Sequence, residues 1–309
     1  MSQKYAIGVD LGGTQIRAAV VTETGEIIER VALPTPAKEG PDAVLAQILK
    51  ATQKLSDSSN QMPIGVASPG PLDTKRGITL GLPTIVGFDH FPFGDRLQET
   101  FGRKVHLTHD GMAAAVGEWK FGAAQGYNDF VYVTVSTGIG GGVISGGKIM
   151  EGRKGMAAHV GHILIEKDGA LCNCGRRGCW EAYASGPAFE KRTHALLRAS
   201  SHSVLNEAST AKEIFAAAAA GDVFATEMVD SEAELLGIGI VNILHAYDPA
   251  LVVLGGGVSQ NFERLKTGIT QTIQNSAMAA FKDVAIKPAQ HIGNSGLLGA
   301  AALAFQNVL

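Results

Sequence analysis

The sequence predicts an α/β protein of two lobes with a cleft between them. Short apolar segments that are typical of buried strands alternate with segments in which apolar residues follow helical spacing. A strand, a glycine-rich turn and a second strand occur near the start of the chain, and the same layout returns about 125 residues later. Two copies of one hairpin indicate two related domains that face each other.

The first part of the chain is expected to begin as a β-meander. YAIGVD (5–10) and QIRAAVV (15–21) are apolar strands joined by the turn LGGT (11–14), and a third strand follows at 26–33. The later elements expected here are, in order, a helix from about Pro41, strands at 64–70 and 104–108, and a helix after Asp110.

The second part of the chain repeats this layout. FVYVTVSTGIGGGVISGG (130–147) again has the pattern of strand, glycine turn and strand, although it is only weakly similar to the first copy residue by residue. LVVLGGGV (251–258) predicts a further strand. Helices are expected over roughly 186–247, after residue 258 and at 295–305.

Composition and charge exclude several classes of protein. The chain has 309 residues, of which 45% are hydrophobic and 18% charged, and a net charge of −3, so neither nucleic acid nor a membrane surface is an expected partner. The most apolar stretch, 235–244, is too short to span a bilayer, and the N-terminus has no charged-then-apolar signal. Three clustered cysteines do not form a secreted disulfide framework. We therefore expect a cytoplasmic protein.

Glycine-rich turns at three places suit phosphate, because glycine exposes backbone N–H groups without a side chain in the way. Asp10 precedes the first turn, and a carboxylate beside phosphate requires an intervening cation, most often Mg²⁺. The sequence has neither a P-loop motif nor G-x-G-x-x-G, which disfavours a dinucleotide; ordinary hairpin glycines are the alternative. The candidate phosphate and ATP ligands are Asp10, Gly12, Gly13, Thr14, Thr137, Gly138, Gly255, Gly256 and Gly257.

Five motifs follow one another along essentially the whole chain: DLGGT (10–14), SPGPLD (68–73), STGIGGG (136–142), C-x-C-G-x-x-G-C-x-E (172–181) and LGGGV (254–258). Their order and sequence resemble the family named repressor, open reading frame and kinase (ROK), whose members are sugar kinases and sugar-responsive repressors with the actin/hexokinase-like, ribonuclease H-like fold. The resemblance implies ATP-dependent phosphorylation of a hexose, usually at the 6-hydroxyl. It also implies Mg²⁺ with ATP, a structural Zn²⁺, small-molecule sugar and ATP as partners, and a homodimer or homotetramer.

Within that fold we expect a smaller α/β lobe of residues 1–119 plus 294–309, which holds the first phosphate hairpin and the catalytic aspartate. A larger α/β lobe of residues 120–293 is expected to hold the second phosphate hairpin, the zinc site and the glycines on the adenosine side of ATP. The repressor branch carries a winged helix before the first glycine hairpin. Here that hairpin starts by residue 10, which leaves no room for one and favours the kinase branch.

The cysteines are interpreted as a metal site. Gly175 and Gly178 permit tight turns between them, and a disulfide is disfavoured because neighbouring Cys-x-Cys pairs make strained bonds and one thiol would be left over. Free structural cysteines are the alternative. Four protein ligands would close a tetrahedral Zn²⁺ site and give it a structural role. The expected ligands are His162, Cys172, Cys174 and Cys179.

Sugar phosphorylation needs a carboxylate that accepts the proton of the attacking hydroxyl. THDGMAAAVGE (108–118) resembles the family motif E-N-D-A-N-A-A-A-x-G-E, which puts Asp110 at the base position. The start of a helix favours the ionised carboxylate there. A simple helix N-cap is the alternative role of this residue.

The resemblance implies sugar contacts from His109, Asp110, His159, His162 and Glu181, with His162 also binding zinc. The family's asparagine before the base is His109 here, and the glutamate of its G-E-x-G-H segment is His159. A carboxylate accepts two hydroxyls, whereas a neutral imidazole offers one donor and one acceptor. These two changes should therefore alter the choice of sugar or the effect of pH on binding.

Three interpretations of the substrate stay open. Most of the chain resembles bacterial glucokinases, whereas AHVGH (158–162) is similar to some bacterial N-acetylmannosamine kinases, and the histidines are alternatively tolerated substitutions in a glucose site. The family's P-N-L-P-G-W loop is also altered, to PTIVGF (83–88). A non-catalytic sugar-binding regulator lacks support, because it would lose the base or the phosphate turns that are present here.

Overall fold

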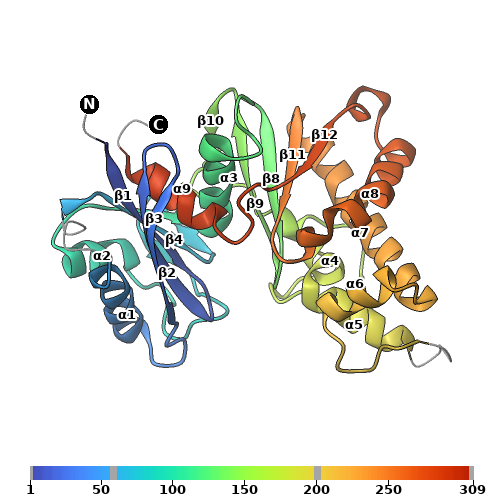
Figure 1. Ribbon diagram of the computed structural model, residues 1–309, viewed down its shortest axis with the longest axis horizontal. Helices are drawn as coiled ribbons and strands as arrows, with labels where there is room; N and C mark the ends of the chain where they lie inside the picture. Colours follow the sequence, from blue (N-terminus) through green and yellow to red (C-terminus); the bar gives the residue numbers. More distant parts are fainter. Residues whose placement is uncertain (1–2, 56–60, 198–202, 306–309) are drawn as a thin grey trace. The chain divides into compact units, whose positions relative to one another are not determined.

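This computed structural model describes residues 3–55, 61–197 and 203–305. Within them the chain forms two five-stranded sheets whose strands follow equivalent orders (Figure 1). The strands are β1 (Tyr5–Leu11), β2 (Gln15–Thr22), β3 (Ile27–Pro34), β4 (Ile64–Ser68), β5 (Leu72–Asp73), β6 (Ile78–Thr79), β7 (Val105–His109), β8 (Phe130–Val135), β9 (Ile139–Ser145), β10 (Lys148–Ile149), β11 (Leu251–Gly255) and β12 (Ala285–Pro288). The sheets have the orders β3-β2-β1-β4-β7 and β10-β9-β8-β11-β12, and β5 pairs with β6. The repeated hairpin predicted from the sequence is therefore present.

The helices occupy the segments in which apolar residues have helical spacing. They are α1 (Pro41–Gln53), α2 (Phe93–Phe101), α3 (Asp110–Phe121), α4 (Glu181–Ala184), α5 (Gly186–Leu197), α6 (Ala211–Ala219), α7 (Val223–Tyr247), α8 (Phe262–Ser276) and α9 (Ser295–Ala304), with 3₁₀ turns η2 (Val160–His162), η3 (Val258–Asn261) and η4 (Ala279–Phe281). Of the helical region expected at 186–247, residues 198–202 lie outside the described ranges. Among the described residues, no helix combines the length and apolar character that a membrane span needs.

The chain forms two compact units. Unit 1 contains residues 1–128, 142–158 and 293–309, and unit 2 contains residues 129–141 and 159–292. These units assign 120–128 and 142–158 to the part that holds the first hairpin, whereas the domain boundaries expected from the sequence lie at 119/120 and 293/294. Those expected boundaries stay a prediction.

In unit 1, the parallel strands β1, β4 and β7 end at one edge of the first sheet. Asp10 pairs in register with Ala67, and Ser68 pairs with His109. Because side chains alternate along a strand, Ala6, Gly8 and Asp10 point to one face, while Ile7 and Val9 point into the apolar core that α1 and α2 cover. Parallel strands present their carboxyl ends to ligands, so this edge is a candidate binding region.

Helix α9 covers the other face of that sheet, and its backbone lies very close to the backbones of β1 and β4. It packs against α3, β1 and β4, so the end of the chain lies beside its first strand (red beside blue in Figure 1). A Cβ atom on Gly8 would lie 2.2 Å from the carbonyl oxygen of Leu297, and one on Gly65 would lie 1.8 Å from that of Ala300. Glycine is required at both positions because the helix backbone occupies the space of a side chain.

In unit 2, β8 and β11 are parallel neighbours and end together. Gly255 pairs in register with Thr134, so the glycines after β11 lie close to the turn after β8. Helix α7, which has 25 residues, packs against α6 and α8 and contacts α4 and α5. Its buried face is continuous along the helix, and this long helix anchors the short elements that carry the candidate site.

Candidate functional site

Asp110 is the first residue of α3 and follows β7 directly. The N-cap of the helix is His109, whose Nδ1 accepts a hydrogen bond of 3.2 Å from the backbone N–H of Met112, so the N-cap role considered for Asp110 belongs to its neighbour. This bond requires an Nδ1 lone pair and puts the imidazole proton on Nε2. His109 is also buried, and its role as a sugar contact stays a prediction.

The Asp110 carboxyl has the electrostatics of a general base. Water reaches the side chain, yet the surrounding protein removes part of its hydration; this desolvation and the charge of Asp10 raise its pKa to about 6. Its Oδ1 accepts a hydrogen bond of 2.7 Å from the backbone N–H of Gly111, which acts in the opposite direction. A pKa between that of a free aspartate and neutrality gives an ionised base at pH 7 that still binds a proton readily.

Asp10 lies at the same edge of the first sheet and is buried. Its Oδ2 forms an ion pair with Arg17, which faces it across the β1–β2 hairpin, and Arg17 also donates a hydrogen bond of 2.5 Å to the carbonyl of Gly293. Burial raises the pKa of Asp10, and Arg17 opposes that shift. Arg17 is not among the site residues predicted from the sequence, although its register opposite Asp10 follows from the turn length. A carboxylate at this position could hold a cation such as Mg²⁺.

The first glycine turn is shaped by two threonines. The Thr35 hydroxyl donates a hydrogen bond of 2.7 Å to the Gly12 carbonyl, which steadies the turn. A Cβ atom on Gly13 would lie 2.9 Å from Cβ of Thr84, in the altered PTIVGF loop, so Gly13 is required by close approach. Thr14 is exposed beside them. The turn is compact and open to solvent, as a phosphate ligand requires.

The other two glycine turns lie at the ends of β8 and β11 in unit 2. Gly256 has a φ of 86°, and a Cβ atom there would lie 2.3 Å from the Val135 carbonyl, so the two turns are in direct contact. Around a Cβ atom on Gly257 there is nothing within 4 Å among the described residues, and Thr137 is exposed. The structure therefore brings Thr137, Gly138 and 255–257 to one open edge.

The four expected metal ligands form one cluster. One ligand atom from each of His162, Cys172, Cys174 and Cys179 lies within 4.8 Å of all the others. Cys172 Sγ is 3.7 Å from His162 Nδ1, and Cys174 Sγ is 3.6 Å from Cys179 Sγ. Tetrahedral Zn²⁺ bonds of about 2.3 Å to sulfur and about 2.0 Å to nitrogen give ligand–ligand edges of about 3.5–3.8 Å. Donor types and spacing fit zinc, and the cysteines are not disulfide-bonded.

A bound cation would change the protonation state of the cluster. Burial raises the pKa of the Cys172 thiol to about 12 and raises that of Cys179, so without a metal these thiols stay protonated at neutral pH. A bound dication reverses this preference and holds them as thiolates.

Backbone geometry explains the glycines of this segment, 170–180. Gly175 has a φ of 85° and Gly178 a φ of 82°, a region in which other residues are strained. A Cβ atom on Gly178 would lie only 1.7 Å from the Glu166 carbonyl. Bridges Leu164–Cys179 and Leu171–Arg177 close the turns around the cysteines. The tight turns expected from the sequence are confirmed.

The expected sugar contacts of unit 2 meet at the first residue of β9. Glu181 Oε2 accepts a hydrogen bond of 2.9 Å from the backbone N–H of Ile139. Gly161, between His159 and His162, lies so close that a Cβ atom would be 2.1 Å from the Ile139 carbonyl. The two imidazole centroids are 6.3 Å apart. Glu181 and the segment that carries His159 and His162 are therefore both packed against the backbone of Ile139.

Ala158 occupies the position of the glycine in the family motif and has a strained backbone conformation. Its φ is 67° and it is buried. An L-residue in this region costs about 1–2 kcal/mol. We expect Ala158→Gly to raise the free energy of unfolding by about 1 kcal/mol, after the entropy cost of glycine is subtracted. Denaturant unfolding measures this. Ala157→Gly, at an ordinary φ, is the control and should lower stability; a loss in both variants would contradict the strain.

The chain is similar to known proteins along nearly its whole length. The profile of the ROK family matches residues 6–307. A glucokinase of Thermotoga maritima is 33% identical over 98% of this chain and 98% of its own, and an N-acetylmannosamine kinase of Citrobacter koseri is 33% identical over 96% and 98%. The crystal structure of a ROK family glucokinase from Streptomyces griseus in complex with glucose and AMPPNP has a TM-score of 0.85, with 34% identity and coverage of 98% and 100%.

These similarities define the fold as that of the sugar kinases. The chain belongs to the ROK family.

Proposed function

We propose that this protein transfers the γ-phosphoryl group of ATP to a hexose, at the 6-hydroxyl, in the manner of a glucokinase. The observation that carries the proposal is the position of Asp110, at the start of α3 beside Asp10, with a pKa of about 6. Full-length similarity to glucokinases supports the same reaction class. The finer assignments below, of residues, ions and sugar, belong to this proposal.

Asp110 accepts the proton of the attacking hydroxyl as the bond to phosphorus forms. The backbone N–H groups of the turns at 12–14 and 137–138 bind phosphate oxygens, and Gly255, Gly256 and Gly257 lie on the adenosine side. His159, His162 and Glu181 hold sugar hydroxyls; since Nδ1 of His162 faces the Cys172 thiol, its Nε2 is the nitrogen available to the sugar.

Two ions complete the proposal. Mg²⁺, held with ATP beside Asp10, would neutralise phosphate charge. Zn²⁺, held by His162 and the three cysteines, would fix the segment that carries His159 and Glu181. A site with three thiolate ligands and a requirement for ATP both suit the cytoplasm, where thiols stay reduced. Assembly as a homodimer or homotetramer stays a prediction.

N-acetylmannosamine is the second candidate substrate, and His159 is the observation that favours it. Its imidazole replaces a carboxylate that would accept two hydroxyls. A relative named N-acetylmannosamine kinase is 33% identical over 96% of this chain, so overall identity does not separate the two substrates. The side chain at position 159 is therefore the residue to test.

An ADP-release assay over glucose, mannose, fructose, N-acetylglucosamine and N-acetylmannosamine tests the function. We expect turnover with at least one of them, and no ADP with any would contradict the proposal. In the same panel, His159→Glu should raise kcat/KM for glucose relative to N-acetylmannosamine by at least about tenfold, because it restores a two-hydroxyl acceptor. His159→Gln, which adds no charge, is the matched control. An unchanged ratio in His159→Glu would remove this residue from sugar selection.

A further inference from the structure

Glu181 is carried by an element that is too short to hold its own shape. Helix α4 has four residues, and Glu181 is the first of them. An isolated helix shorter than about 12 residues is unstable in water, so α4 depends on tertiary contacts. Zinc would hold the chain just before α4 in place, because Cys179 lies two residues before Glu181. Helices α5 and α7, in unit 2, supply further contacts to α4.

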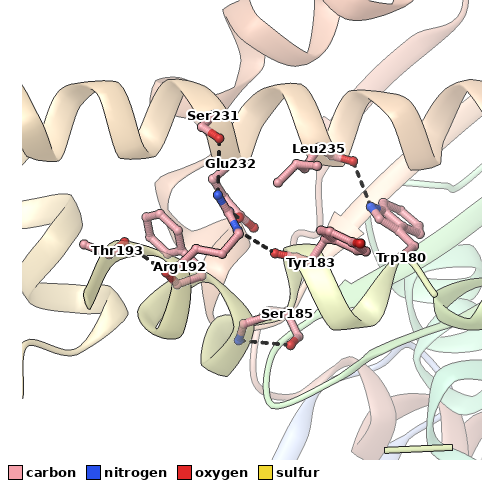
Figure 2. A network of polar contacts seen from close by, with 10 residues as sticks. Trp180, Tyr183, Ser185, Arg192, Thr193, Ser231, Glu232 and Leu235 are labelled. Carbon is pink, nitrogen blue, oxygen red and sulfur yellow. Dashed lines mark hydrogen bonds and ion pairs between the residues drawn. The ribbon is translucent and has the colours of Figure 1, made fainter. Parts of the chain in front are cut away.

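Arg192, on α5, links α4 to α7 (Figure 2). Its Nε donates a hydrogen bond of 3.0 Å to the carbonyl of Tyr183 in α4. Its Nη2 donates one of 2.5 Å to Glu232 Oε2, and its Nη1 donates one of 3.2 Å to Ser231 Oγ, both on α7. A planar guanidinium can make these contacts in fixed relative directions, which an ammonium group cannot.

The residue before Glu181 is fixed to the same helix. The Trp180 side chain is fully buried, and its indole Nε1 donates a hydrogen bond of 2.9 Å to the carbonyl of Leu235 in α7 (Figure 2). The ring lies against Gly239, where a Cβ atom would be 1.9 Å from Cε2. Trp180 and Tyr183, on either side of Glu181 in sequence, are therefore both tied to α7.

The ion pair of Arg192 with Glu232 is buried at its Glu232 end. Glu232 is completely buried, and its Oε1 has no hydrogen-bond partner within the described part of the chain. Desolvation raises the pKa of Glu232 to about 8, against the effect of Arg192. Replacing a buried pair by apolar residues is often neutral or stabilising, so burial of this pair is weak evidence for a role in stability and is compatible with a role in fixing geometry.

We propose that Arg192 and Glu232 are positioning residues that orient α4, and through it the Glu181 carboxylate, for sugar binding. This inference rests on the proposed function. Glu181 Oε2 lies 2.9 Å from the backbone nitrogen of Ile139, and its Oε1 lies 3.5 Å from Cys172 Sγ. A rotation of α4 after loss of the Tyr183 contact would move this carboxylate away from both neighbours and from the sugar hydroxyls.

The test compares Arg192→Lys with the double variant Arg192→Met/Glu232→Leu. Lysine keeps the charge and cannot reach Tyr183 and Glu232 together, while the apolar pair removes the buried charges. For both we expect sugar KM to rise at least about tenfold, with KM for ATP within about twofold and zinc content unchanged. The unfolding midpoint of the double variant should equal or exceed that of wild type. Arg264→Lys, whose parent side chain contacts Thr226 on α7, is the matched control and should change nothing.

An unchanged sugar KM in a folded, zinc-loaded double variant would overturn the inference. A parallel loss of affinity for both substrates would do the same, because it would indicate general damage to the fold. Sugar binding without ATP, followed by tryptophan fluorescence, separates the two proposals. Wild type that binds sugar without turnover contradicts the kinase function and still allows the positioning effect to be measured; wild type that does neither overturns both.

Discussion

Asp110→Asn should reduce kcat by at least about 10²-fold, because the asparagine keeps the shape of the side chain and cannot accept the hydroxyl proton. Sugar affinity should change little, since hydrogen-bonding capacity is largely retained. The ADP-release assay at saturating sugar and ATP measures kcat, and fluorescence titration measures binding. Asp95→Asn, at the first turn of α2, is a matched control at another helix start and should keep full activity. Unchanged turnover in Asp110→Asn would remove this residue from the role of base.

The pH dependence of kcat/KM is a second test of Asp110 as the base. The base must be ionised, so kcat/KM of wild type should fall tenfold per pH unit below a pKa of about 6. In Asp110→Asn this decrease in kcat/KM at low pH should be absent.

The pH dependence of protein stability tests the direction of the pKa shift of the Asp110 carboxyl. The pKa of the Asp110 carboxyl in the folded protein lies above that of a free aspartate, so ionisation opposes folding. This cost is absent below the unfolded pKa and complete above the folded one. Asp110→Asn should therefore be more stable than wild type at pH 8 and similar to it at pH 3.5, as measured by denaturant unfolding. Equal stability at both pH values would contradict the raised pKa.

Removal of the zinc ligands is expected to have the second large effect. Purified wild type should contain about one zinc per chain, and Cys179→Ser should contain less than about a tenth of that. Cys179 is fully buried between the segment that carries the histidines and α4, so its loss should also raise sugar KM at least about tenfold. Metal analysis and the kinetic assay measure these quantities. His90→Asn removes an exposed histidine elsewhere and should retain the metal.

Less than about half a zinc per chain in gently purified wild type would contradict a structural zinc site. Cys179→Ser with normal zinc content would instead remove Cys179 from the ligand set. Full activity after complete removal of zinc would show that the metal does not support the sugar contacts.

Local chemistry explains why much of the fold was predictable. The hairpin at 5–21 follows from two apolar runs around a glycine turn, and the structure confirms β1 and β2 there. The same argument holds for β8 and β9. The metal cluster was predictable too, because a C-x-C-x₄-C spacing with glycines at 175 and 178 restricts the cysteines to one small volume.

Other features depend on residues far apart in sequence. That His109 rather than Asp110 is the N-cap of α3 depends on backbone geometry where β7 ends, which residue type alone does not set. The requirement for Gly8 and Gly65 comes from α9, more than 200 residues later in the chain. Such contacts carry no local signal, because each residue is compatible with its own strand whatever packs on it.

The sequence by itself determined the two hairpins, the family and the members of the His/Cys cluster, since these depend on spacing and residue type within short segments. Only the tertiary structure decided what supports the site. It brought Glu181 to Ile139 and tied α4 to α7 through Arg192. The physical reason is that an ionic or hydrogen-bonding group takes whichever partner the packing of helices and sheets puts within reach, and that packing is a property of each whole unit.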